Sequence, residues 1–157
     1  MTGSQRPLAP GDLAEWIGKY EGGGTNHEGE AFDAAAELRE IALGQSLCLE
    51  FTATGRTGEV FHTEVSLISE DLSGSGLKLA QACSNIPGLA VHQCTGAVVS
   101  ADGRLESVEF SFGGDSAGFR QVLTLNRPRA GTLEYTFAWA MAGEPVEPRS
   151  SATMTAV

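Results

Sequence analysis

Short runs in which hydrophobic and polar residues alternate cover most of this chain. A period of two places every second side chain on the same face, which is typical of a β-strand that buries one face. The clearest run is 46–54, where one face carries Leu47, Leu49, Phe51 and Ala53. The run 132–142 is built in the same way, with Leu133, Tyr135, Phe137, Trp139 and Met141 on one face.

Ten runs of this kind can be assigned, and turn-forming residues separate most of them. The runs are 18–26, 31–41, 46–54, 59–69, 76–83, 89–99, 104–112, 118–126, 132–142 and 149–157. Connections as short as Pro87-Gly88 and Asp102-Gly103 force neighbouring strands to run antiparallel. The run 31–41 is ambiguous, because its Ala, Glu and Leu residues also suit a helix.

Ten strands with open edges would be prone to aggregation, and closure of the sheet removes the edges. We therefore predict an all-β fold, a closed antiparallel barrel of about ten strands. The same pattern also allows a two-layer sandwich. Small residues on one face of the run 31–41 would leave room inside the barrel.

The N-terminal segment differs from the rest of the chain. Residues 1–11 are predicted to form a tail, and Asp12 is suited to cap a short helix over 12–17, with Glu15 three residues later. This helix would carry Leu13, Trp16 and Ile17. Because no linker or repeat follows, residues 12–157 are expected to form a single barrel domain.

The chain is acidic, with 10 Lys and Arg against 20 Asp and Glu and a net charge of −10. Such a surface repels phosphate backbones and anionic membranes, so neither nucleic acid nor a membrane is an expected partner. No apolar stretch approaches the ~20 residues that span a bilayer, and no secretory signal pattern is present, which favours a cytoplasmic location. Three cysteines without such a signal do not indicate a disulfide framework.

Two motifs are candidates for a phosphate-binding loop and for a metal site. Gly22-Gly23-Gly24 resembles a phosphate-binding loop, but no helix start or lysine follows, so a close approach of the backbone is favoured. His92 and Cys94 share one face of a strand, yet a zinc site would need two further ligands nearby. No metal site is predicted.

His62 and Glu64 alternate onto one face of the run 59–69 and are suited to act as a base and its orienting partner. The opposite face is the more apolar one, since it carries Phe61, Thr63, Val65 and Leu67. Alternation alone therefore places His62 and Glu64 on the solvent side.

Three segments resemble the nitrobindin family over nearly the whole chain, from about residue 13 to 157. The segment 18–24 resembles the family's G-x-W-x-G-x-G opening, with Tyr20 in the Trp position, and Phe61-His62-Thr63-Glu64 resembles its M-H-x-E segment. The segments 133–137, 143–146 and 151–154 look like its last two strands and the turn between them.

The resemblance implies a ten-stranded antiparallel barrel of the calycin type, related in architecture to fatty-acid-binding proteins, with heme in an apolar cavity. It also implies that His62 faces the lumen. Arg149, however, stands where the family's iron-ligating histidine is expected. Because an arginine is protonated and only donates, it cannot coordinate iron.

We therefore predict a binding protein that holds a small, mostly apolar or amphipathic molecule and has no heme or other cofactor. Tyr20, His62, Trp139 and Arg149 are the predicted ligand-binding residues, and Arg149 would pair with a carboxylate. The alternative is an enzyme on the same barrel, in which His62 and Glu64 act as an acid–base pair and Arg149 orients an anionic substrate. Heme ligation through another residue such as His92 is a third interpretation. The sequence leaves a homodimer open.

Overall fold

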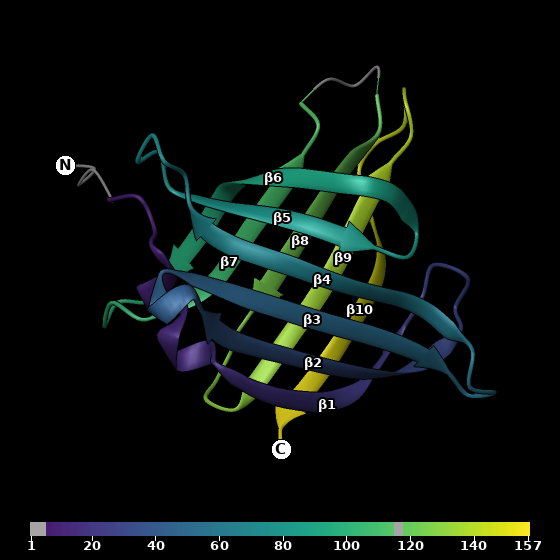
Figure 1. Cartoon of the computed structure of the whole chain (residues 1–157). Coiled ribbons are helices and arrows are strands. Elements are labelled where there is room, and N and C mark those ends of the chain that lie inside the picture. Colours follow the sequence, from purple (N-terminus) through teal and green to yellow (C-terminus); the bar gives the residue numbers. More distant parts are fainter. Residues whose placement is uncertain (1–5, 115–117) are drawn as a thin grey trace.

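The computed structural model describes residues 6–114 and 118–157, and ten strands form a closed antiparallel barrel (Figure 1). Each strand pairs with the next, and β1 pairs with β10, which closes the sheet. The strands are β1 (Gly18–Thr25), β2 (Ala31–Ile41), β3 (Ser46–Gly55), β4 (Val60–Glu70), β5 (Leu77–Cys83), β6 (Ile86–Val99), β7 (Leu105–Phe112), β8 (Arg120–Asn126), β9 (Thr132–Ala140) and β10 (Glu147–Ala156). This confirms the predicted barrel and excludes the sandwich.

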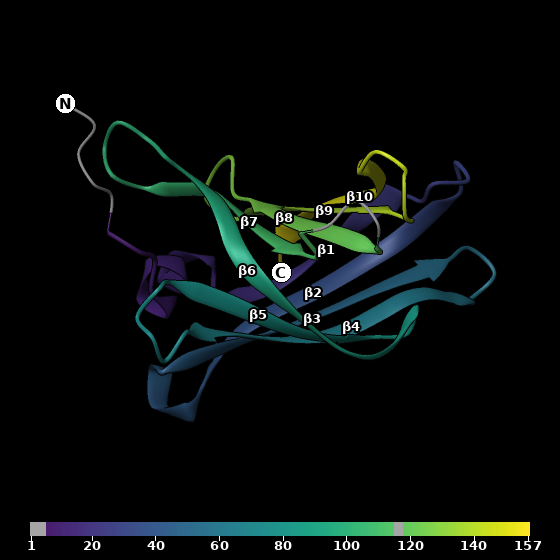
Figure 2. The same ribbon diagram turned by 90° about the horizontal axis from the view of Figure 1, so that it is seen from above.

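The ambiguous run 31–41 is strand β2 along its whole length. Its side chains alternate between exposed and buried, with Phe32, Ala34, Ala36 and Leu38 inside. Tertiary pairing with β1 and β3 therefore overrides the helical propensity of Ala and Glu. Seen from above, β3–β5 and β7–β9 form opposite walls of the barrel (Figure 2).

Strand β1 explains the glycine run that resembled a phosphate loop. A Cβ on Gly22 would lie 2.1 Å from the Thr153 carbonyl oxygen, and one on Gly24 would lie 2.0 Å from that of Ser151. Here β1 and β10 approach too closely for any side chain. The structural interpretation of Gly22-Gly23-Gly24 is confirmed.

One end of the barrel is closed by η1, a 3-10 helix over Pro10–Trp16 that buries Leu13 and Trp16 in the core. The prediction that Asp12 caps this helix is wrong, because the helix begins at Pro10, whose fixed φ suits a first turn. Asp12 lies inside the first turn, where its carboxylate accepts the Ala9 N–H at 2.8 Å. The second short helix, η2 (Ala42–Gly44), forms the turn between β2 and β3.

Strand β4 has the opposite phase to the one that alternation predicted. Val65 and Leu67 are 46% and 47% exposed, whereas Glu64 and Ser66 are buried inside the barrel. The polar face of β4 therefore faces the interior, as the family resemblance implied for His62.

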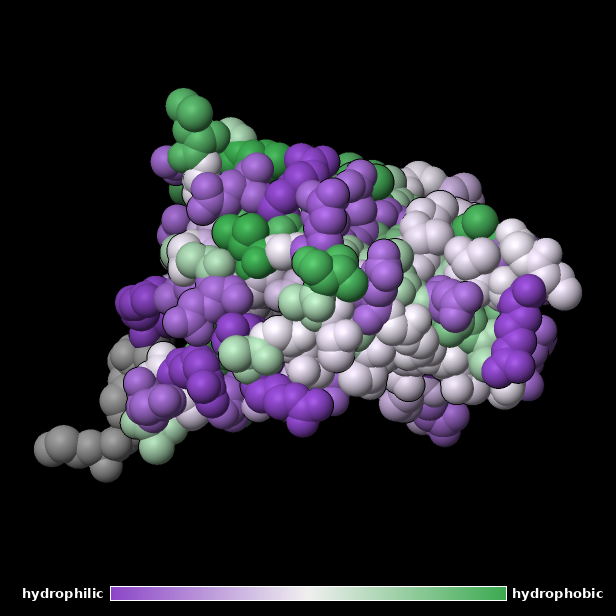
Figure 3. Space-filling model, turned by 90° about the horizontal axis from the view of Figure 1, so that it is seen from below, coloured by the Kyte–Doolittle hydropathy of each residue, from purple (hydrophilic) through white to green (hydrophobic). Residues whose placement is uncertain are grey.

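Outside the barrel, the face below β1 is mostly hydrophilic or neutral and shows only separate hydrophobic areas (Figure 3). Within residues 6–114 and 118–157, neither helix has the length and hydrophobicity that a membrane crossing requires.

Candidate functional site

A cavity of about 600 Å³ occupies the end of the barrel away from η1. The β1–β2 turn, the β5–β6 turn and the ends of β3, β4, β9 and β10 surround it. Its wall is rich in aromatic side chains, namely Phe32, Phe51, Phe61, Phe119, Phe137 and Trp139. A space of this size and lining suits one small, mostly apolar molecule.

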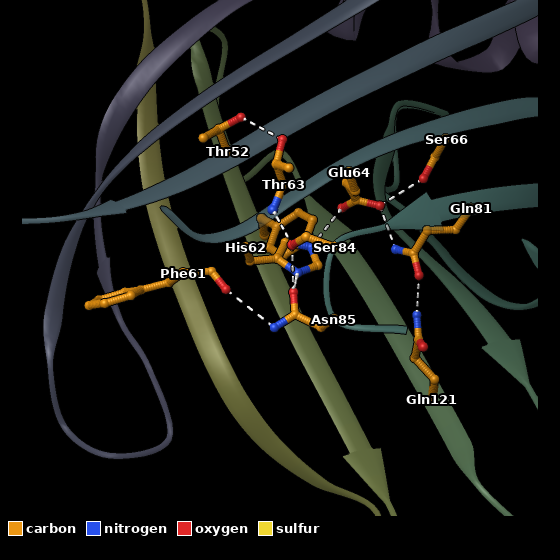
Figure 4. Close-up of polar contacts among 11 residues, drawn as sticks. Thr52, Phe61, His62, Thr63, Glu64, Ser66, Gln81, Ser84, Asn85 and Gln121 are labelled. Atoms are coloured by element: carbon orange, nitrogen blue, oxygen red, sulfur yellow. Dashed lines mark hydrogen bonds and ion pairs between the residues drawn. The ribbon is translucent and has the colours of Figure 1, made fainter. Parts of the chain in front are cut away.

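His62 borders the cavity, and the Asn85 side chain fixes its tautomer (Figure 4). The Asn85 amide donates through Nδ2 to the Phe61 carbonyl at 3.2 Å, which leaves its Oδ1 to face the imidazole Nδ1 at 2.6 Å. Because Oδ1 only accepts, Nδ1 carries the proton and donates it to Asn85. The other nitrogen, Nε2, lies 3.4 Å from the Tyr135 hydroxyl. Both ring nitrogens therefore face protein groups.

Glu64 lies directly behind His62 and does not border the cavity. Its Oε1 is 3.9 Å from His62 Nε2, which is longer than a hydrogen bond, while Oε2 accepts hydrogen bonds from Ser66 Oγ at 2.7 Å and from Gln81 Nε2. Burial acts to raise the pKa of the Glu64 carboxyl, but His62, Tyr135 and Ser66 together hold that pKa below its ordinary value. Glu64 is therefore an ionised group inside the barrel.

The hydrogen-bonded chain continues across the barrel to β8, where Gln121 Nε2 donates to Gln81 Oε1. His92 on β6 is also fully buried, and burial lowers the pKa of its imidazole, so its ring is neutral. Sequence reasoning missed Gln81 and Gln121. The available signal was their phase, since each alternates with leucines that face inward, Leu79 and Leu123 among them.

Arg149 and Trp139 lie together at the mouth of the cavity. The guanidinium stacks over the Trp139 ring at 4.5 Å, and its Nε donates to the Trp139 carbonyl at 3.2 Å. Two carboxylates, of Glu144 and Glu147, stand 3.9 and 4.0 Å from its terminal nitrogens. The charge of Arg149 is thus partly balanced within the protein.

Tyr20 does not border this cavity. It is buried near η1, where its hydroxyl donates to the Trp16 carbonyl at 2.6 Å. The structure therefore brings three of the four predicted ligand-binding residues together at the cavity, namely His62, Trp139 and Arg149.

Where the family resemblance implies an iron-ligating histidine, the cavity wall carries Arg149, which cannot coordinate iron. Both nitrogens of His62 face other protein groups. His92 does not border the cavity, which leaves His27 and Met141 as the wall residues with a donor of the kind that binds heme iron.

Comparison with known proteins shows the fold and indicates no particular function. No protein-family model matches the sequence, and no curated protein does. The crystal structure of Rv2717c from M. tuberculosis matches with a TM-score of 0.64 and 12% identity, covering 98% of this chain and 99% of that one. A de novo designed fluorescence-activating β-barrel and EF1p2_mFAP2b bound to DFHBI match with TM-scores of 0.47 and 0.46 and identities of 12% and 8%. The two matches cover 93% and 96% of this chain, and 98% and 100% of the matched chains.

Proposed function

We propose that the protein binds one small, mostly apolar molecule in the cavity at the open end of the barrel. The observation that carries the proposal is the cavity itself, about 600 Å³ in volume and walled by six aromatic side chains. Burying such a molecule against aromatic rings gains hydrophobic free energy without leaving polar groups unpaired. His62 and Trp139 would contact the molecule, and Arg149 would meet any hydrogen-bond acceptor it carries at the mouth.

We also propose that the chain is a nitrobindin-like, calycin-type barrel that has lost the family's heme ligand. The order of the three resembling segments along the chain supports this relationship, and so does the ten-stranded closed barrel. The arginine at position 149 favours a cargo other than heme.

The enzymatic alternative has less support. An acid–base pair needs a nitrogen that is free to exchange a proton with the substrate, and His62 directs Nδ1 to Asn85 and Nε2 toward Tyr135. Glu64 lies behind the cavity wall and 3.9 Å from the imidazole.

Fluorescence titration with 1-methylanthracene tests the binding proposal. We expect saturable binding of one molecule per chain. Ala53→Phe should weaken it at least tenfold, because Ala53 lies in the cavity wall beside His62, its partner on the neighbouring strand. The matched control is Ala82→Phe, on the outer face of β5, which should leave binding unchanged. Equal binding by both variants, or no saturable binding by the wild type, would overturn the proposal. If binding is confirmed, native mass spectrometry of freshly purified protein would identify the natural molecule.

A further inference from the structure

The interior polar cluster behind His62 contains atoms with no hydrogen-bond partner. We define this cluster as Glu64, Ser66, Gln81, His92 and Gln121, all of which are buried. Among the described residues, Glu64 Oε1, Gln121 Oε1 and both ring nitrogens of His92 are buried without a partner. Native proteins rarely leave such groups unpaired, so a cluster of them indicates a missing hydrogen-bonding group.

The unpaired atoms determine whether a group bound beside them must donate or accept hydrogen bonds. Glu64 Oε1 and Gln121 Oε1 only accept, and a neutral imidazole offers one donor and one acceptor. Together, the unpaired atoms therefore comprise three acceptors and one donor. Within the described part of the chain, no lysine or arginine forms an ion pair with the Glu64 carboxylate, and His62 at 3.9 Å is its nearest cationic candidate.

We propose that the interior polar cluster is a subsite for a group that donates more hydrogen bonds than it accepts, supplied either by water or by the amino end of the molecule in the cavity. The second source rests on the proposed binding function. A carboxylate is excluded from this subsite, because it would add acceptors beside an ionised Glu64.

The subsite is one side chain away from the cavity. His62 borders the cavity on one side and approaches Glu64 on the other. Phe51, also in the cavity wall, stacks on Tyr135 with ring centroids 3.9 Å apart. A small displacement of the His62 ring, which Asn85 holds by one hydrogen bond, would expose Glu64 to the cavity. Figure 4 shows these side chains as they lie in the structure, in the order Asn85, His62, Glu64, Gln81 and Gln121.

Matched probes test whether the ligand supplies the group. 1-Aminoanthracene and 1-methylanthracene differ by an amino group in place of a methyl group of similar size. We expect the amine to bind about tenfold more tightly to the wild type, and this ratio to fall to about one in Gln121→Met and in His92→Leu. Ala82→Phe, on the outer face of β5, is the control and should leave the ratio unchanged. Arg149→Gln should weaken binding of anthracene-1-carboxylate, whose charge is directed to the mouth.

The second arm tests whether water supplies the group. Magnetic relaxation dispersion of ¹⁷O in ligand-free protein should detect long-lived internal water in the wild type and less of it in Gln121→Met, with circular dichroism confirming that both are folded. Long-lived water without a preference for the amine would assign the subsite to water alone. If the protein shows neither long-lived internal water nor a preference for the amine, the proposed subsite is overturned. If none of the anthracenes bound, the binding function would fail, and the water arm would still decide the subsite.

Discussion

Replacing Gly22 with alanine should destabilise the barrel strongly, because the new methyl group has no space. The added Cβ would meet three backbone atoms of β10, the Thr153 carbonyl oxygen at 2.1 Å, Met154 Cα at 2.8 Å and the Thr153 carbonyl carbon at 3.0 Å. Backbone atoms cannot rotate away as a side-chain end can. β1 and β10 must therefore separate locally, at the seam that closes the barrel.

The magnitude follows from two opposing effects. Forcing an extra methyl group into a packed site costs about 1–3 kcal/mol, and a clash with the backbone falls at the upper end of that range. The reduced entropy of the unfolded chain offsets this by about 0.4–1 kcal/mol. We expect Gly22→Ala to lower the free energy of unfolding by about 2 kcal/mol. With a slope of about 1–3 kcal/mol per molar urea, the midpoint of unfolding should fall by about 0.7–2 M.

Gly23 is the matched control, because it lies next to Gly22 in the same strand with its Cβ position on the outside. A Cβ there would have one close neighbour, the Phe32 carbonyl oxygen at 3.1 Å. Gly23→Ala should therefore change the midpoint by less than half as much. Equal midpoints for the two variants would refute the argument that close approach of β10 explains the glycines.

Three further predictions concern the cofactor, the buried carboxylate and the closed end. Hemin titration of the wild type should give no Soret band of a coordinated iron, whereas Arg149→His should create stoichiometric binding; a coordinated spectrum in the wild type would show that another residue ligates iron. Because the folded-state pKa of Glu64 lies below the ordinary 4.5, its contribution to stability is present above pH 4.5 and is lost as the pH falls through the folded value. Urea unfolding at pH 6 and pH 3 should therefore show a smaller acid-induced loss in Glu64→Gln than in the wild type, and an equal loss would contradict this assignment. Leu13→Ala should cost about 2–5 kcal/mol of unfolding free energy, because Leu13 is fully buried, yet the folded variant should bind 1-methylanthracene as the wild type does; weakened binding would show that η1 and the cavity are coupled.

The strands were predictable from sequence because turn residues and alternation are local signals. The phase of β4 was not, since its inward face is polar. What makes that face stable inside the barrel is a set of partners on distant strands, Gln81 on β5 and Gln121 on β8, which hydrogen-bond in a chain to Glu64. The sequence of β4 alone does not indicate that these partners lie on other strands. The resemblance to nitrobindins placed His62 in the lumen where alternation placed it outside.

The helix start was missed for a related reason. Asp12 has the side chain of a capping residue, but the chain is already helical at Pro10, so its carboxylate meets the Ala9 N–H from inside the first turn. Glu15, the expected partner of the cap, instead reaches Arg127 at 3.3 Å, which is 112 residues away in sequence.

Closure of one end by η1 has a kinetic consequence. A molecule in a dead-ended cavity leaves by the path along which it entered, so the same rim residues control both directions of exchange. A substitution at the rim that raises the barrier to passage should slow association and dissociation by the same factor and leave the dissociation constant unchanged. A substitution in the aromatic wall should alter the dissociation rate alone. Glu28, an exposed residue of the β1–β2 turn at the mouth, and Phe51 in the aromatic wall belong to these two classes, so the closed end makes gating and affinity separable in this barrel.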